Sequence, residues 1–216
     1  MWYFMNSQTR YTEFFVKLSL YILFMIISQK KRWDIGNNLL FHAIAHGDAK
    51  DVLALLEDKE AQPNCTNVNG ATPLHFAVYY QNKEILELLI KYGANPNVKE
   101  YYDVGFCTPL HRAIERNNYE LCKILLAAGA DPNIQEKNGF TALHYAARKG
   151  FADIVKLLLD SGVDVNKRDS FGNNASYWAK AGGFTKVMEL LPPPARITSE
   201  ELHDHWAAMR EVHEIP

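Results

Sequence analysis

The sequence predicts an all-α solenoid of about five helix-turn-helix repeats joined by short hairpin loops. Three kinds of residue recur in one register and support this prediction. His75, His111 and His144 lie 36 and then 33 residues apart. Glycines and asparagines repeat the same two steps, at Gly93, Gly129 and Gly162 and at Asn97, Asn133 and Asn166. A fixed period of this length indicates units that stack on their neighbours rather than around one central core.

The histidines belong to a short motif that points to a family. Thr-Pro-Leu-His stands at 72–75 and at 108–111, and Thr-Ala-Leu-His at 141–144, with alanine two positions after each histidine. With this motif and period, the chain resembles the ankyrin-repeat family over about residues 34–194. The resemblance implies that the motif histidines hydrogen-bond within and between repeats. It also implies a concave binding surface.

The predicted organisation has three parts. Residues 1–33 are an apolar N-terminal extension, residues 34–194 the ankyrin-repeat domain, and residues 195–216 a C-terminal amphipathic helix. The repeats are expected at about 34–66, 67–99, 100–135, 136–168 and 169–194. The first and last depart from the motif, which is expected of capping repeats with a neighbour on one side only.

Each complete repeat carries the residues that its local structure needs. Glycine supplies a tight turn, threonine is suited to the N-cap of the first helix, and proline is tolerated directly after the cap. The second helices, such as 85–90 and 154–159, carry closely spaced aliphatic residues and are expected to bury one face. Repeat three carries three extra residues in the loop 100–106. Tyr101 and Tyr102 in this loop either contact a partner or pack over a neighbouring hairpin.

The two ends of the chain leave alternatives open. The apolar run at residues 14–28 includes Lys17 and is shorter than the roughly 20 residues of a spanning helix. It is either a membrane anchor, a packing extension or the product of a misplaced gene start. As an anchor, it would keep the repeats on the cytoplasmic side, because basic residues follow it at 30–32. The helix at 195–216 either packs on the last repeat or docks on a partner.

The sequence shows no catalytic constellation. It lacks phosphate-binding, nucleophile-elbow, zinc-protease and dinucleotide motifs, and His203, Asp204 and His205 would point in different directions on a helix. Cys65, Cys107 and Cys122 form no CxxC pair. We therefore expect no enzymatic activity, no cofactor and no metal, and we expect a cytoplasmic protein, with the nucleus as an alternative. A net charge of -2 argues against nucleic-acid binding.

The expected partner-binding residues follow from the register of the first helices. The position after each motif histidine, and the two positions before the next turn, should face the concave surface. With the loop tyrosines, this gives Phe76, Tyr79, Tyr80, Tyr101, Tyr102, Arg112, Arg116, Tyr145, Arg148, Lys149 and Trp178. Such a surface, aromatic at both ends and basic in the middle, would suit an acidic or acidic-flanked segment of another protein. The alternative is an ordinary solvated helix face.

The predicted function is a non-enzymatic protein–protein interaction module that acts as a scaffold, adaptor or inhibitor and is a monomer. Two alternatives stay open because the family serves many functions. One is a membrane-tethered regulator that recruits a cytoplasmic partner. The other is the targeting domain of a larger enzyme.

Overall fold

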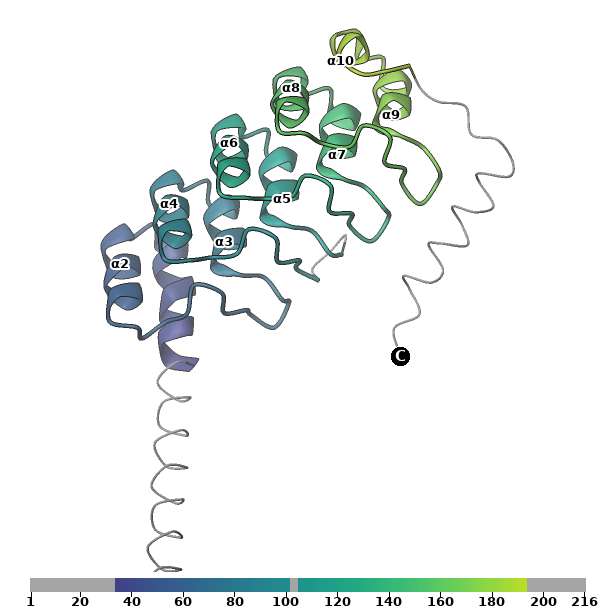
Figure 1. Ribbon diagram of the computed structural model, residues 1–216. Helices are drawn as coiled ribbons and strands as arrows, with labels where there is room; N and C mark the ends of the chain where they lie inside the picture. The colour runs from purple at the N-terminus through teal and green to yellow at the C-terminus, as the bar shows by residue number, and fades with distance from the viewer. Residues whose placement is uncertain (1–33, 102–104, 194–216) are drawn as a thin grey trace, which may run out of the picture.

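The computed structural model describes residues 34–101 and 105–193, which form a stack of helix pairs (Figure 1). Residues 34–46 are helical and are followed by α2 (Ala49–Glu57). The later pairs are α3 (Pro73–Tyr79) with α4 (Lys83–Lys91), α5 (Pro109–Glu115) with α6 (Tyr119–Ala127), α7 (Ala142–Lys149) with α8 (Ala152–Asp160), and α9 (Ala175–Ala181) with α10 (Thr185–Leu190). The predicted all-helical repeat fold is confirmed.

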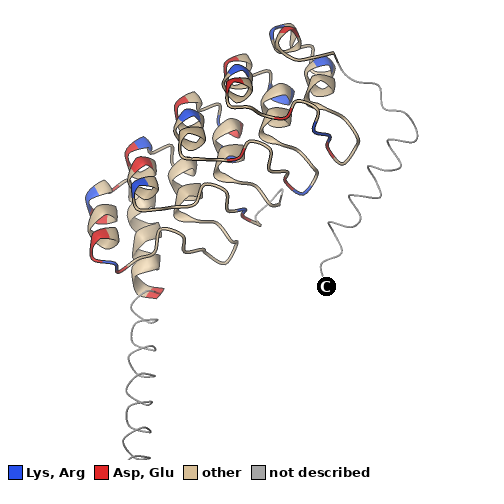
Figure 2. Ribbon diagram, in the orientation of Figure 1, with Lys and Arg blue, Asp and Glu red and all other residues tan. Residues whose placement is uncertain are grey.

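The helices form two layers. The first helices α3, α5, α7 and α9 pack side by side, and the second helices α2, α4, α6, α8 and α10 form the other layer. Each first helix is preceded by a hairpin, and the hairpins project from the same side of the stack (Figure 1). Figure 2 shows that charged residues of both signs lie largely on the second helices and in the loops.

The hairpins span residues 67–71, 100–107, 136–140 and 169–173. In each, the amide of the first residue donates a hydrogen bond to the carbonyl of the last, over 2.9 to 3.0 Å. The hairpin of repeat three therefore holds the three extra residues expected there. The α5 helix behind it still packs against both α3 and α7, so the insertion leaves the helical stack intact.

All three motif histidines bond to the N-cap of their own helix, and two of them also bond to the following repeat. Thr72, Thr108 and Thr141 are the N-caps of α3, α5 and α7, as predicted. Three residues on, the histidine Nδ1 accepts from the backbone N–H of the threonine at 3.1 to 3.3 Å. The Nε2–H of His75 then donates to the Cys107 carbonyl in the next hairpin at 3.1 Å. The implied bond within the repeat is confirmed for all three histidines, and the bond between repeats is confirmed for His75 and His144.

Burial keeps the histidine rings neutral. Removal from water lowers the pKa of His75 and His144, and it lowers the pKa of His111 to about 4. The Nε2 of His144 donates to the Asn173 carbonyl at 3.1 Å. The Nε2 of His111 faces the Phe140 carbonyl but falls short of good hydrogen-bond geometry.

Asparagine side chains also bond one repeat to the next, through the turns that follow the second helices. Asn97 shows the pattern: its Nδ2 donates to the Gly129 carbonyl at 3.0 Å, and its Oδ1 accepts from the Asp131 amide at 2.8 Å. Asn64 makes the same two contacts with the repeat after it, and Asn133 accepts from the following repeat in the same way. Two of the three recurring asparagines of the sequence, Asn97 and Asn133, therefore link one repeat to the next.

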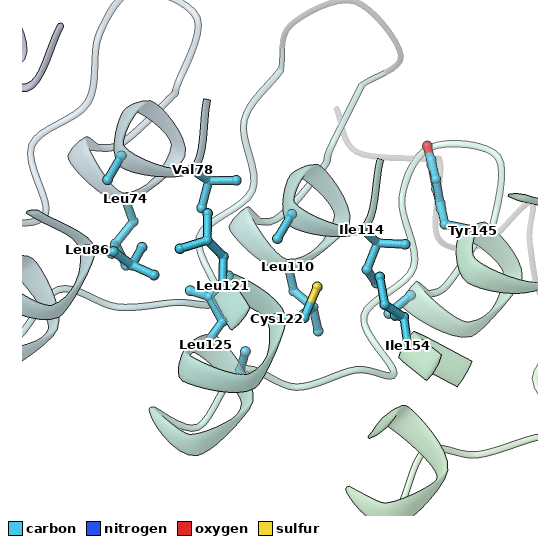
Figure 3. Close-up of a cluster of buried hydrophobic side chains, with 14 of the residues drawn as sticks. Leu74, Val78, Leu86, Leu110, Ile114, Leu121, Cys122, Leu125, Tyr145 and Ile154 are labelled. Atoms are coloured by element: carbon cyan, nitrogen blue, oxygen red, sulfur yellow. The ribbon is translucent and has the colours of Figure 1, made fainter. Parts of the chain in front are cut away.

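The apolar core lies between the two layers of helices (Figure 3). Leu74 and Leu110 of the first helices and Leu86, Leu121 and Leu125 of the second helices are all fully buried. Burial of aliphatic side chains along the whole array supplies most of its stability, since apolar area removed from water is the main favourable term in folding.

Within residues 34–101 and 105–193, no helix is both long enough and apolar enough to cross a membrane. The apolar run at 14–28 and the predicted helix at 195–216 lie outside these described residues.

Candidate functional site

Five of the predicted site residues surround one hollow between repeats two and three. The hollow has a volume of about 430 Å³. Phe76, Tyr79 and Tyr80 line it from the side of α3, and Arg112 and Arg116 line it from the side of α5. The other lining residues are Asn67, Asn69, Ala71, His75, Glu100 and Glu115.

The aromatic wall of the hollow presents two exposed tyrosines over a partly covered phenylalanine. Tyr79 is 59% exposed and Tyr80 is 45% exposed, and their rings meet edge to face with centroids 5.1 Å apart. Phe76 is half-buried between Phe41, at 4.8 Å between ring centroids, and Tyr80, at 6.4 Å. This wall offers a large apolar contact surface, and tyrosine is among the residues that contribute most at interfaces.

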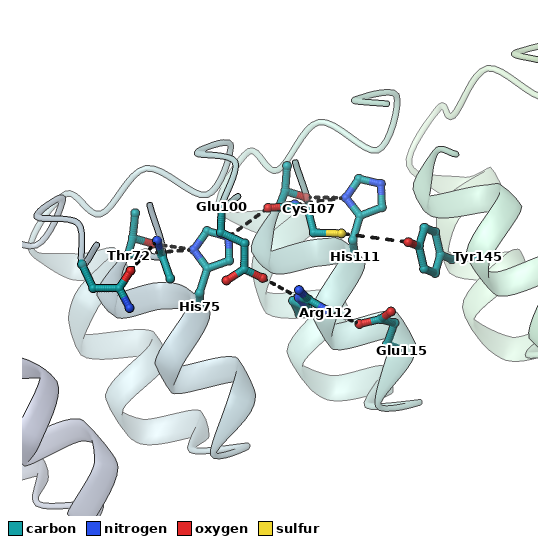
Figure 4. Close-up of polar contacts among 11 residues, drawn as sticks. Thr72, His75, Glu100, Cys107, His111, Arg112, Glu115 and Tyr145 are labelled. Atoms are coloured by element: carbon teal, nitrogen blue, oxygen red, sulfur yellow. Dashed lines mark hydrogen bonds and ion pairs between the residues drawn. The ribbon is translucent and has the colours of Figure 1, made fainter. Parts of the chain in front are cut away.

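Arg112 is already paired within the chain (Figure 4). Its Nε contacts the Glu100 carboxylate, and its Nη1 donates to Glu115 Oε2 at 2.8 Å. Glu100 is buried and Glu115 is partly buried, so these contacts are shielded from solvent more than a surface ion pair is. Contrary to our expectation of an open basic residue, Arg112 therefore has a structural role at the edge of the hollow.

The pairing of Arg112 reflects a contact that recurs along the array. The first residue of a hairpin faces the helix residue that follows the motif histidine. In repeat three these residues are Glu100 and Arg112, and in repeat five they are Asp169 and Trp178. The Trp178 Nε1–H donates to Asp169 Oδ2 at 2.6 Å, and Asp169 is fully buried. Trp178, predicted to face a partner, is therefore half-buried and bonded to its own hairpin.

Tyr145 occupies the same position in repeat four and is buried, with 5% of its surface exposed. Its hydroxyl lies 3.9 Å from Cys107 Sγ, and its ring meets those of His111 and Phe140 edge to face at 5.4 and 5.8 Å. Burial raises the pKa of this hydroxyl above its ordinary value. The expectation that Tyr145 lies on the open surface was wrong, because residues of repeats three and four pack around its side chain.

Three of the predicted basic residues remain exposed on the ends of the first helices. The Arg116 guanidinium lies 4.3 Å from the centre of the Tyr79 ring. Arg148 lies 5.3 Å from the centre of the Phe140 ring, and Lys149 beside it is exposed. Over the described part of the chain, no carboxylate lies within ion-pair distance of these three residues.

Tyr101 packs over the preceding hairpin while most of its ring stays exposed. Its N–H donates to the Asn69 carbonyl at 2.8 Å. Its ring covers Gly70, where a Cβ atom would lie 2.5 Å from a ring carbon and where φ is +71°, so only glycine fits there. The ring also meets that of Phe106 at 5.4 Å between centroids and is 65% exposed. Tyr102 lies outside the described residues.

Two acidic residues of the site, Glu100 and Glu115, are not among the predicted partner-binding residues, although the register places Glu115 on the concave surface. Glu115 has a local signal, because it stands three residues after Arg112 on one helix, the spacing of an ion pair. Glu100 has no comparable signal. It lies 12 positions before Arg112 and meets it only because the hairpin folds over the helix.

The groups at the hollow are suited to non-covalent contacts with another molecule. Among the residues that the structure describes, no three histidine, cysteine or acidic side chains gather into a metal site. Burial raises the pKa of the Cys107 thiol to about 11, which keeps it protonated and unreactive at neutral pH. What the hollow presents is an apolar aromatic wall beside one exposed guanidinium.

The repeat region of the chain matches a known family along its whole length. A family model of ankyrin repeats in three copies matches residues 16–100, 40–136 and 110–200. The chain is 36% identical over 63 residues to alpha-latrotoxin-Lg1a of Latrodectus geometricus, which covers 28% of this chain and 5% of the toxin. It is 41% identical over 51 residues to the transient receptor potential channel pyrexia of Drosophila melanogaster, covering 24% of this chain and 5% of the channel.

A human protein is similar to the chain over a segment of comparable length. The chain is 35% identical over 69 residues to ankyrin repeat domain-containing protein 35 of Homo sapiens, which covers 32% of this chain and 7% of the relative. The match therefore spans less than a tenth of each of these three relatives, so it concerns a short segment of each and not the whole protein.

Proposed function

Since this chain belongs to the ankyrin-repeat family, we propose that it is a non-enzymatic module that binds another protein through the concave face of its repeats. Ankyrin repeats are generally protein–protein interaction modules and are typically non-enzymatic. The observation that carries the proposal is the hollow between repeats two and three. There, Tyr79 and Tyr80 expose their rings and Arg116 exposes its guanidinium next to them.

The partner that we propose is an acidic or acidic-flanked segment of another protein, which this chain would bind as a scaffold, adaptor or inhibitor. Arg116, Arg148 and Lys149 support this choice, because they are exposed cations on the first-helix layer. Complementary charge speeds encounter and sets the register of binding more than it raises affinity. The apolar contacts must therefore supply much of the affinity.

We also propose that the protein acts as a monomer in the cytoplasm, with the nucleus as an alternative. All three cysteines are free and buried, which suits a reducing compartment. If residues 14–28 insert into a membrane, the repeats would stay on its cytoplasmic side.

An affinity capture from cells tests the binding face. The full chain would be compared with a Tyr79→Ala/Tyr80→Ala variant and with Tyr119→Ala, which removes a tyrosine of similar exposure from α6 in the other layer. We expect a set of proteins to be lost with the double variant and retained with Tyr119→Ala. Thermal unfolding of each variant serves as a control, because exposed substitutions usually change stability by less than about 0.5 kcal/mol. Equal recovery from all three chains would contradict binding through this face.

A further inference from the structure

We propose that the hollow between α3 and α5 receives one aromatic or large aliphatic side chain of a partner segment, and that Arg116 binds a carboxylate close to that side chain. This inference rests on the proposed function and specifies which residues of the concave face recognise the partner. Arg116, Tyr79, Tyr80 and Phe76 would contact the partner. Arg112 would shape the hollow without contacting the carboxylate.

The hollow has room for a large side chain. Its volume of about 430 Å³ lies in the lower part of the range of small ligand sites. Phe76, Tyr79 and Tyr80 give it an aromatic wall against which a further ring can pack edge to face or offset-stacked. A side chain that packs against these rings loses its contact with water on that side, and burial of this kind is typical of the residues that dominate binding energy.

The hollow is open in repeat two because its helix position has no polar partner in the hairpin. Asn67 begins this hairpin, and its Oδ1 accepts from the amides of Asn69 and Ala71 at 2.9 and 3.0 Å. The facing helix residue, Phe76, has no polar atom to bond with it. In repeats three and five the equivalent positions are joined by Glu100–Arg112 and by Asp169–Trp178, as described above. Of these positions, only that of repeat two leaves an unbonded aromatic side chain partly open to solvent.

Arg116 is the residue at the hollow with guanidinium donors available. It is exposed and held at the rim by the Tyr79 ring, and the described residues give it no carboxylate partner. The neighbouring Glu115 is bonded to Arg112 instead, at 2.8 Å. A planar guanidinium with free donors binds a carboxylate through two parallel hydrogen bonds.

The acidic residues of the hollow also set the direction of the partner segment. Glu100 and Glu115 both face Arg112, so this corner carries two negative charges against one positive charge. A partner carboxylate would be repelled there and attracted at Arg116. The carboxylate is therefore expected on the Arg116 side of the inserted side chain, away from Glu100.

The test is selection of random 12-residue peptides, displayed on phage, against the full chain. Enriched peptides would be synthesised and their Kd measured by fluorescence anisotropy against the native chain, Arg116→Glu and Lys123→Glu. Lys123→Glu is the matched control, because it makes the same change of charge at an exposed position of α6, in the other layer of helices, and does not line the hollow. A Tyr79→Ala variant reports on the aromatic wall.

We expect the enriched peptides to share an aromatic or large aliphatic residue with Asp or Glu within a few positions. Arg116→Glu should weaken their binding by at least about tenfold, whereas Lys123→Glu should change it by less than about twofold. Replacing the acidic residue of the peptide by lysine should restore binding to Arg116→Glu, which a purely structural role of Arg116 would not produce.

Three results would overturn the proposal: enriched peptides without an acidic residue, no enriched peptide at all, or a Kd that Arg116→Glu leaves unchanged. If Tyr79→Ala weakens binding while Arg116→Glu does not, the carboxylate assignment fails but binding through the concave face stands. If neither Tyr79→Ala nor Arg116→Glu affects binding, both this proposal and the proposed function are wrong.

Discussion

The buried histidines predict that acid destabilises the fold, and His111 allows the effect to be calculated. The ordinary pKa of a histidine is 6.5, and burial lowers that of His111 to about 4 in the folded chain. Between these two values the unfolded chain binds more protons than the folded chain, so a fall in pH through this window favours unfolding. The stabilising contribution is fully present above the unfolded pKa and is lost as the pH approaches 4.

The size of the effect follows from the same two values. At pH 5, His111 would be almost fully protonated in the unfolded chain and about one-tenth protonated in the folded chain. Each pKa unit corresponds to about 1.4 kcal/mol, so acidification from pH 7.5 to 5 should remove about 2 kcal/mol of unfolding free energy through this residue. His75 and His144 shift in the same direction, because burial lowers their pKa as well. Burial raises the pKa of Glu136, so that residue opposes the trend.

Urea denaturation of the native chain and of His111→Asn, each at pH 7.5 and at pH 5, isolates the contribution of His111 to the free energy of unfolding. The asparagine oxygen can accept the Thr108 amide bond, as Nδ1 does at 3.3 Å, but asparagine does not titrate. The native chain should lose about 2 kcal/mol more than the variant between the two pH values. An equal loss in both chains would refute the argument, as would a His111 ring resonance that titrates near pH 6.5 in the folded protein.

Two further predictions concern packing. Leu125→Ala, at a fully buried position of α6, should lower the free energy of unfolding by roughly 2 to 5 kcal/mol in urea denaturation, and a negligible loss would mean that α6 does not carry the inter-repeat core. Ser176→Ala should raise it by about 1 kcal/mol, because Ser176 is buried where three other repeats place leucine and its hydroxyl has no partner in the described part of the chain. A loss of stability in Ser176→Ala would show that the hydroxyl is hydrogen-bonded.

The repeat fold was predictable because each complete repeat carries, in its own sequence, the capping and motif residues that its helices need. Thr72, Thr108 and Thr141 stand where a helix needs a cap, and the histidines after them recur in the same register. A pattern that returns three times is far less ambiguous than a single amphipathic segment. The fold could therefore be predicted without any knowledge of long-range contacts.

The candidate site was only partly predictable. The register of the repeats indicates on which face of a helix a residue lies, but it does not indicate which side chains surround that residue. Phe76, Arg112, Tyr145 and Trp178 hold one position in four repeats, yet their surroundings differ. Phe76 lines a hollow, Arg112 is paired with two carboxylates, Tyr145 is buried, and Trp178 is bonded to Asp169. These differences arise from the hairpin that faces each helix. The period of the repeat does not indicate which hairpin residue contacts the helix residue.

The asparagine links described above constrain how an array like this one changes its length. The side-chain amide of Asn97 donates one hydrogen bond to the next repeat and accepts another from it. A deletion that shifts the register would therefore leave both the donor and the acceptor of this amide without their partners. Excision of one whole repeat would instead bring the next equivalent turn into the same place and remake both bonds. Gain and loss of sequence in the stack should therefore come in complete repeats, whereas partial insertions are confined to the hairpin tips, as at residues 100–107.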